Sequence, residues 1–242
     1  MLSINLFNAV ITNLRDETPF PPVERALRTP NGLLAVGGGL APARLLDAYR
    51  QGIFPWFNAD DPILWWSPDP RMVMFPGEFR ISRSLRKTLR KQGFEVRTDT
   101  VFEQVMRNCA APRNGQAGTW IHEEMIDAYT HLHRMGYAHS VETWKNGELA
   151  GGLYGIAIGH MFYGESMFSR YTDASKVAFA HLAAQLRRWN FGMIDCQMNT
   201  PHLATLGARE ISRTEFVRRL QELIHYRDIA SPWHFDKDEF AA

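Results

Sequence analysis

Three polar side chains in the second half of the chain close apolar segments and are placed to do chemistry. Glu165 ends the apolar run that begins at Met161, and Asp195 and Gln197 end the short run MIDCQ. Neighbouring side chains of a strand alternate between its faces, so we expect Asp195 and Gln197 to share one face and Cys196 to point into the core. Asp195 would then accept a hydrogen bond from the Gln197 amide and turn the amide oxygen towards a donor such as an incoming amine.

Glu165 belongs to a different strand end from the Asp195–Gln197 pair, and ligands of open α/β sheets bind where strand ends meet. Its carboxylate suits an ammonium or guanidinium group, and it could also hold the attacking amine in place. The segment from Gly151 to Asn199 therefore predicts a pocket with polar groups beside apolar walls. In the alternative interpretation, the three side chains only satisfy local backbone groups.

Motifs for a nucleophile or a metal are missing from the sequence. It has no G-x-S-x-G elbow, and Ser166 has no His close by in the chain. His131 and His133 are two residues apart, so on a helix they do not share a face. We therefore expect no metal site.

Strands and helices that follow one another along the chain are expected to position the polar groups. Residues 138–166 predict an antiparallel meander with turns at Asn146-Gly147 and Gly159-His160. A helix from Ser175 to Trp189 then leads into MIDCQ. Further helices are expected over residues 42–51, 82–92, 100–110, 119–136 and from Ser212 onwards, and strands over 71–77 and 94–99.

Three of the expected helices begin at side chains that can cap them. Ser82 is the expected N-cap of the second helix. Thr100 with Glu103, and Ser212 with Glu215, have the spacing of capping boxes. The final segment SPWHFDKDEFAA has no periodicity and is expected to be loosely held.

The order of elements predicts an α+β fold in two parts. Residues 1–70 would form a small, irregular lobe rich in Pro and aromatic side chains, and residues 71–242 a mixed-sheet lobe with helices on both faces. Gly37 to Gly39 lack the Lys-Ser/Thr of a phosphate loop, so a flexible turn is the favoured interpretation.

Aromatic side chains gather in GIFPWFNADDPILWWSPDPR, which starts at Gly52 and is too irregular for a regular element. Most of them are expected to hold the first lobe against the second. Trp56 could instead remain partly exposed and stack on a nucleic-acid base. Trp120, at a loop-to-helix junction, is either a core anchor or a second stacking platform.

Basic side chains crowd the segment before Gly93, while its buried stripe consists of Leu85 and Leu89. Acidic partners at i±4 are missing, so the segment either forms a solvated face or binds a polyanion such as nucleic acid. The cations are Arg80, Arg83, Arg86, Lys87, Arg90 and Lys91.

The amino-acid composition is that of an ordinary globular protein: the chain has 242 residues, 45% of them hydrophobic, and a net charge of +1. Two Cys exclude a disulfide framework and a four-Cys zinc site, and suggest buried thiols in a reducing cytoplasm. A secretory signal is not apparent, and no apolar run approaches the roughly 20 residues of a membrane-spanning helix. We therefore expect a cytoplasmic protein without membrane association.

A set of short motifs resembles the leucyl/phenylalanyl-tRNA–protein transferase family. In chain order they are GIFPWF, WWSPDPR, GTWI, AHSVE, GGLYG, GESMFS, ASK and IDCQ, and the resemblance extends from about Pro22 to about Leu220. It implies transfer of Leu or Phe, and less well Met, from charged tRNA to proteins that begin with Arg or Lys, marking them for N-degron proteolysis. It also implies an acetyltransferase-like second lobe.

The resemblance assigns roles to individual residues. It implies that Asp195 and Gln197 activate the acceptor amine, that Glu165 is the pocket carboxylate, and that Trp56 and Trp120 hold the terminal adenosine. Several wall residues differ in identity from a well-known member, which leaves the preference among donors open. The implied apolar wall is Leu153, Phe162, Met167, Phe179, Leu182, Leu186 and Ile194.

The donor ester is already activated, so we expect no cofactor. The expected partners are Leu-tRNA, Phe-tRNA and acceptors with N-terminal Arg or Lys, and the expected state is a monomer. Two other functions compete with this one. An acetyl-CoA N-acyltransferase would need a Q/R-x-x-G-x-G/A loop, which the sequence lacks. A non-catalytic RNA-binding protein would leave Glu165, Asp195 and Gln197 unexplained.

Overall fold

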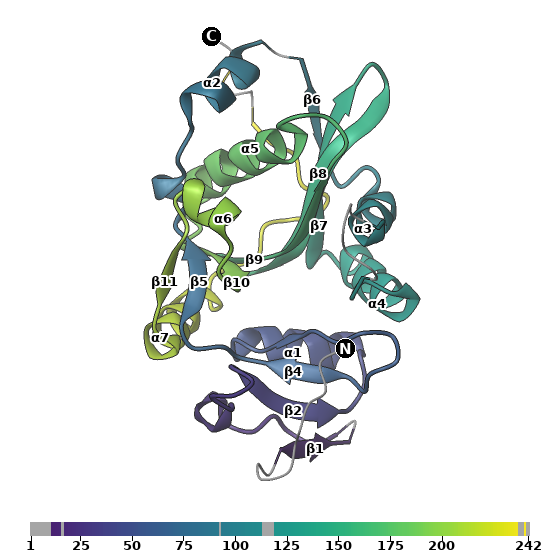
Figure 1. The fold of residues 1–242 in the computed structure, drawn as a ribbon, viewed down its shortest axis with the longest axis vertical. Helices are drawn as coiled ribbons and strands as arrows, with labels where there is room; N and C mark the ends of the chain where they lie inside the picture. The colour runs from purple at the N-terminus through teal and green to yellow at the C-terminus, as the bar shows by residue number, and fades with distance from the viewer. Residues whose placement is uncertain (1–10, 16, 92, 113–118, 237–239, 241–242) are drawn as a thin grey trace.

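The structure, a computed structural model, describes residues 11–15, 17–91, 93–112, 119–236 and 240. It contains a four-stranded sheet of order β1-β2-β4-β3 and a seven-stranded sheet of order β11-β5-β10-β9-β8-β7-β6 (Figure 1). Helices pack around the larger sheet. This mixed architecture confirms the expected α+β class.

The four-stranded sheet makes the N-terminal part more regular than the sequence suggested. The aromatic-rich segment supplies two of its strands, in which Phe54 pairs with Trp66 and Pro55 with Trp65. Strands this short are too brief to show a period-two pattern, so their sequence gives no sign of them. The elements are β1 (Thr12–Leu14), β2 (Leu33–Gly37), α1 (Pro42–Arg50), β3 (Phe54–Pro55) and β4 (Leu64–Trp66).

The seven-stranded sheet contains the predicted meander. Both residues of the Asn146-Gly147 turn have positive φ, 53° and 79°, which suits a tight hairpin. β9 and β10 run parallel, joined by a helix, and every other neighbouring pair is antiparallel. The strands are β5 (Arg71–Met74), β6 (Glu95–Thr98), β7 (Ala138–Lys145), β8 (Glu148–Ile158), β9 (Met161–Ser169), β10 (Met193–Gln197) and β11 (Arg209–Ile211).

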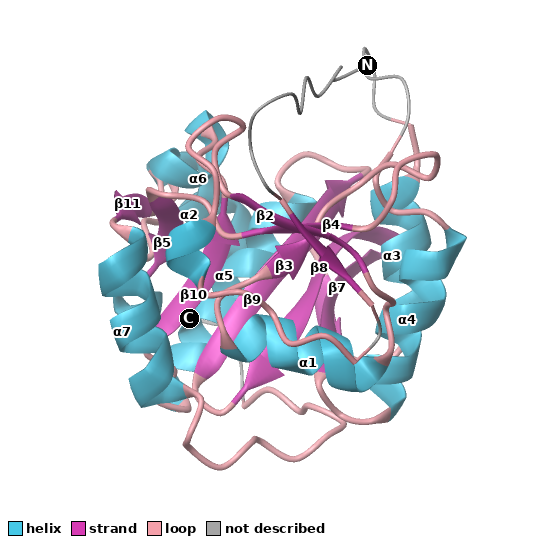
Figure 2. Ribbon diagram, turned by 90° about the horizontal axis from the view of Figure 1, so that it is seen from below, coloured by secondary structure: helices cyan, strands magenta, loops and turns pink. Residues whose placement is uncertain are grey.

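Helices cover both faces of this sheet, and Figure 2 places α3 and α4 on the side of β7 and α7 on the side of β5 and β11. None of the helices among the described residues is long and apolar enough to cross a bilayer. The helices are α2 (Arg83–Arg90), α3 (Phe102–Ala110), α4 (Glu123–Arg134), α5 (Ala174–Arg188), α6 (Pro201–Thr205) and α7 (Arg213–Leu223).

The predicted caps at Ser82 and Ser212 are confirmed, since each hydroxyl accepts a backbone N–H of its helix at 3.2 Å. The capping box at Thr100 is wrong. Its hydroxyl and its backbone N–H both bond to the carboxylate of Glu142, which is fully buried on β7. A buried carboxylate needs such donors, and this demand outweighs the local capping pattern.

The C-terminal segment is anchored through residue 236, so the expectation of a loosely held tail is wrong there. Trp233 is 1% exposed and its ring stacks on His139 at 3.7 Å. Its backbone N–H donates to Asp99 at 2.8 Å, and its carbonyl accepts from Thr98. A single aromatic anchor leaves no periodic pattern for sequence analysis to detect.

Candidate functional site

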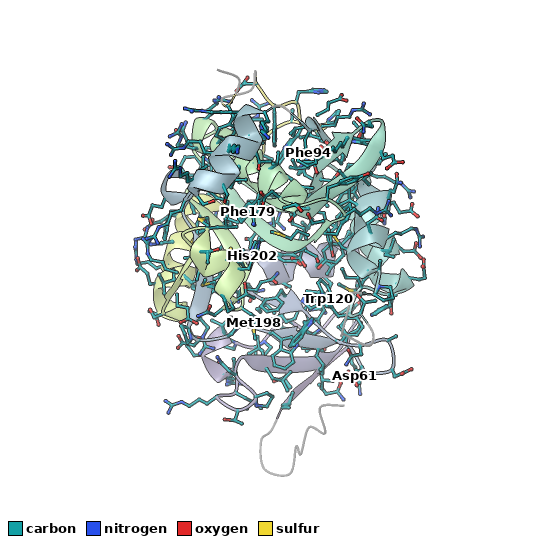
Figure 3. The ribbon with its side chains drawn as sticks, turned by 45° about the horizontal axis from the view of Figure 1, so that its top comes forward. Asp61, Phe94, Trp120, Phe179, Met198 and His202 are labelled. Carbon is teal, nitrogen blue, oxygen red and sulfur yellow. The ribbon has the colours of Figure 1, made fainter. Side chains whose placement is uncertain are left out.

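A cavity of about 450 Å³ opens between the large sheet, α5, α6 and β3. Figure 3 shows Trp120, His202 and Phe179 around the centre of this face, with Met198 beside them. The wall is mostly apolar. Its polar end lies where β10 finishes beside the middle of β9, so Glu165 does not stand at a strand end as expected. Residues of this wall that the sequence analysis did not single out include Phe54, Tyr154, Met198, Thr200, His202 and Leu203.

The predicted apolar wall largely coincides with the lining of this cavity. Leu186 is the exception, because it is fully buried in the cluster of α5 and does not reach the cavity surface. Phe179 and Leu182, three residues apart on α5, share one helix face and do reach it. The lining residues from the predicted wall are Leu153, Phe162, Met167, Phe179, Leu182 and Ile194.

Glu165 provides the carboxylate of the cavity. Its Oε1 accepts hydrogen bonds from the Tyr49 hydroxyl at 2.8 Å and from the Gln197 side-chain amide at 3.0 Å. Its Oε2 accepts from the Tyr129 hydroxyl at 3.4 Å, and the two tyrosine oxygens are 2.5 Å apart. Burial, followed by the nearby negative charge of Asp195, raises the pKa of Glu165 to about 8 despite these donors.

Asp195 does not line the cavity, which corrects the expected arrangement. It is fully buried, and Arg71, itself 1% exposed, binds both of its oxygens, with Nε at 2.8 Å and Nη2 at 2.6 Å. Oδ1 also accepts the backbone N–H of Gln197 at 2.9 Å. Asp195 therefore holds the Gln197 backbone and does not orient the Gln197 amide.

A bulge in β10 explains the change of face. Asp195 pairs with Val73 and Gln197 with Met72, so Cys196 is an extra residue without a partner on β5. An inserted residue breaks the two-residue alternation of a strand. Cys196 consequently lines the cavity instead of the core, and Gln197 reaches it through a left-handed backbone with φ 61°.

Arg71 is the main residue that sequence analysis missed. Besides Asp195, it donates to the Gly52 carbonyl at 3.1 Å, and its guanidinium lies 4.7 Å and 4.5 Å from the ring centres of Phe54 and Phe216. It therefore connects β3, β10 and α7 at the base of the site. A lone arginine opening the apolar strand RMVM was the available signal, because a buried cation needs a buried anion.

Trp56 and Trp120 both line the cavity on the side of the four-stranded sheet. Each is half-buried, so part of each indole is accessible. The Trp66 indole donates to the Trp56 carbonyl at 2.7 Å, and the two rings pack edge to face at 5.6 Å. Trp56 is thus held at the rim by its neighbour on β4.

All six predicted cations on or beside α2 are exposed. Within the part of the chain that the structure describes, their side chains form neither an ion pair nor a hydrogen bond. Leu85 and Leu89 pack α2 against Val177 and Ala180 of α5, whose opposite side faces the cavity. Among the same residues, no group of His, Cys, Asp and Glu is placed to hold a metal ion.

Two family models match the chain. The model of the leucyl/phenylalanyl-tRNA protein transferase matches residues 73–221, and that of its N-terminal domain matches residues 38–69. A protein of Nitrosomonas europaea with this name is 64% identical over 227 residues, which is 94% of this chain and 96% of its own. A protein of the same name from Chromobacterium violaceum is 59% identical, and the match covers 92% of this chain and 95% of that protein. The chain belongs to the leucyl/phenylalanyl-tRNA–protein transferase family.

The cavity of this chain takes residues from both matched ranges. Trp56 lies in the N-terminal match, whereas Trp120, Glu165 and Gln197 lie in the larger one. Arg71 lies between the two matches, although it touches residues of both.

Solved structures overlap with this family member only weakly. A GCN5-related N-acetyltransferase from Kribbella flavida is 9% identical and covers 69% of this chain and 60% of its own, with a TM-score of 0.35. The L-PGS structure from Bacillus licheniformis is 10% identical. The match covers 66% of this chain and 51% of that one, with a TM-score of 0.38.

Proposed function

We propose that this chain transfers Leu or Phe from charged tRNA to the N-terminal amino group of an acceptor protein. The observation that carries the proposal is the cavity, which places an apolar wall, a carboxylate with an amide, and two accessible indoles within one site of a family member. The wall suits the aminoacyl side chain, the indoles suit the terminal adenosine, and the polar end suits an amine.

The chemistry requires alignment more than activation. The amine nitrogen bonds to the ester carbonyl carbon, the ester C–O bond breaks, and the ribose hydroxyl leaves with the proton that the amine loses. Holding two reactants in line contributes roughly 7–11 kcal/mol in favourable cases. The apolar wall also keeps water from the ester.

Gln197 is the side chain proposed to meet the amine. Its amide nitrogen donates to Glu165, which leaves the amide oxygen to accept from an N–H. Asp195 and Arg71 act as positioning residues, because their bond network fixes the backbone at Gln197. This assignment differs from the one that the resemblance implied, in which Asp195 itself activates the amine.

Acceptors that begin with Arg or Lys fit the carboxylate of Glu165. A cation beside it favours the ionised form, which burial alone disfavours. We also propose that the active form is a monomer. Because charged tRNA is used in protein synthesis, we place the reaction in the cytoplasm, where the product would enter N-degron proteolysis.

Trp56→Ala is expected to raise the KM for Leu-tRNA by about tenfold or more, since stacking on a base contributes about 1–3 kcal/mol. Trp56→Phe keeps an aromatic face for stacking, so its KM for Leu-tRNA should be close to that of the wild type. The measurement is steady-state transfer with the acceptor in excess. A KM for Leu-tRNA that Trp56→Ala leaves unchanged contradicts the adenosine site.

A comparison of donors tests the proposed function against its competitors. The chain is incubated with a peptide that begins with Arg and with labelled Leu-tRNA, Phe-tRNA or acetyl-CoA. Label is expected in the peptide from both charged tRNAs and not from acetyl-CoA. Acetyl transfer supports the acyltransferase alternative, and tRNA binding without transfer supports the RNA-binding alternative.

A further inference from the structure

The proposed function leaves a stretch of the donor without a contact. The terminal adenosine would lie at the two indoles beside the four-stranded sheet, whereas the cations of α2 lie beyond α5. In Figure 3, Trp120, His202 and Phe179 follow one another from the lower part of the molecule towards the upper part, where α2 lies. A strand of nucleic acid that joins the two sites passes the rim formed by α6 and the start of α5.

Lys176 stands at this rim. It precedes the cavity-lining Phe179 by three residues, so the two share one face of α5. The Lys176 side chain is 37% exposed, and its ammonium donates to Asp173 at 2.8 Å. The other oxygen of Asp173 accepts from Thr88 of α2 at 3.2 Å. Asp173 thus fixes the ammonium at the junction between the basic helix and the cavity.

His202 lies on α6 and lines the cavity mouth. Partial burial and then the positive charge of Lys176 lower the pKa of His202 below its ordinary value. His202 and Phe179 line the same cavity, and Lys176 lies one turn before Phe179 on α5, so both side chains lie at the same rim. A neutral imidazole still offers one N–H donor, and an ammonium offers up to three. An N–H donor and a cation at the same rim are groups that bind phosphate oxygens.

We propose that Lys176 and His202 form a phosphate-binding subsite, which holds the backbone of the donor 3′ end between the cavity and α2. The proposal rests on the proposed function. The ligand chemistry is one internucleotide phosphate near the aminoacylated end. The subsite contributes affinity for the donor but does not touch the reacting ester.

Three donors of increasing length test the subsite. The leucyl ester of adenosine has no phosphate, the leucyl ester of the dinucleotide CpA has one, and Leu-tRNA has the whole backbone. Lys176→Ala and His202→Gln are compared with the wild type, and Arg134→Ala serves as a control because this exposed cation lies at the end of α4. The measured quantity is the KM for each donor at a fixed concentration of a peptide that begins with Arg.

Both variants are expected to raise the KM for the CpA ester and for Leu-tRNA by about fivefold to tenfold, which corresponds to one hydrogen bond of ordinary net strength at a solvent-exposed rim. The KM for the adenosine ester should not change, and Arg134→Ala should match the wild type with all three donors. Lys176→Ala should also reduce the salt dependence of the KM for Leu-tRNA by about one phosphate contact.

The outcomes separate this subsite from the function on which it rests. If the wild type transfers from none of the donors, the proposed function fails. If it transfers and the variants raise the KM for all donors equally, or for none, the subsite is contradicted while the proposed function stands.

Discussion

Arg71→Met is expected to lower the free energy of unfolding by about 3–5 kcal/mol, because it leaves Asp195 as a buried charge without a partner. The variant also loses the cation–π contacts between the guanidinium and the rings of Phe54 and Phe216, which adds to the effect. The measurement is urea unfolding followed by fluorescence. Arg107→Met is the control, since Arg107 forms ion pairs with Glu103 and Glu123 but is exposed, and it should change stability by less than about 1 kcal/mol.

The same pair decides whether Asp195 is chemically active. In Arg71→Met with Asp195→Asn, neither member of the buried ion pair carries a charge, and the Asn oxygen can still accept the backbone N–H of Gln197. Stability should recover most of the loss, and kcat should lie within about tenfold of the wild type, much closer than in Arg71→Met alone. A double variant that folds but stays as inactive as the single one indicates that the Asp195 carboxylate takes part in proton transfer.

Glu165→Ala is expected to reduce kcat/KM for a peptide that begins with Arg by about 100-fold, most of it in the KM for the acceptor. A hydrogen bond to a charged group contributes about 1.5–3 kcal/mol, and the Gln197 amide also loses its acceptor. The KM for Leu-tRNA should change little. Glu165→Gln keeps an acceptor for the Tyr49 hydroxyl and should bind Leu-tRNA normally while remaining poor with cationic acceptors. Equal losses for donor and acceptor contradict this assignment.

Glu165 also gives stability a defined pH dependence. Because its pKa in the fold is raised to about 8, the unfolded chain loses this proton at lower pH than the folded chain does. The contribution to stability is therefore complete below the unfolded pKa and is lost as pH rises to about 8. As pH rises from about 5.5 to about 8, the free energy of unfolding of Glu165→Gln should increase by up to about 3 kcal/mol relative to that of the wild type. A constant difference across that window contradicts the raised pKa.

Local patterns predicted the parts of the fold that local forces decide. The meander follows from its glycine turns and alternating strands, and Ser82 and Ser212 cap their helices as their spacing indicates. Thr100 has the same spacing, yet its hydroxyl binds Glu142, which lies 42 residues away in the chain. A contact of that kind cannot be found in a window of a few residues.

The site shows the same division. Glu165 and Gln197 were found because each polar group follows an apolar run, and both line the cavity. Gln197 does end β10, whereas β9 continues beyond Glu165 to Ser169. Asp195 and Cys196 exchanged faces because one inserted residue reverses the alternation of a strand, and no residue type announces this bulge. The role of Arg71 was recognised only from the structure, where it is the ion-pair partner of the buried Asp195.

The position of the new bond tests most directly whether this protein transfers Leu to an N-terminal amine. The chain is incubated with labelled Leu-tRNA and a peptide that begins with Arg and contains an internal Lys, and the product is sequenced from its N-terminus. The same peptide with an acetylated N-terminus is the control. One Leu joined to the N-terminal Arg is expected, with no label in the acetylated peptide. Label on the internal Lys, label in the acetylated peptide, or release of free Leu alone contradicts transfer to the N-terminal amine.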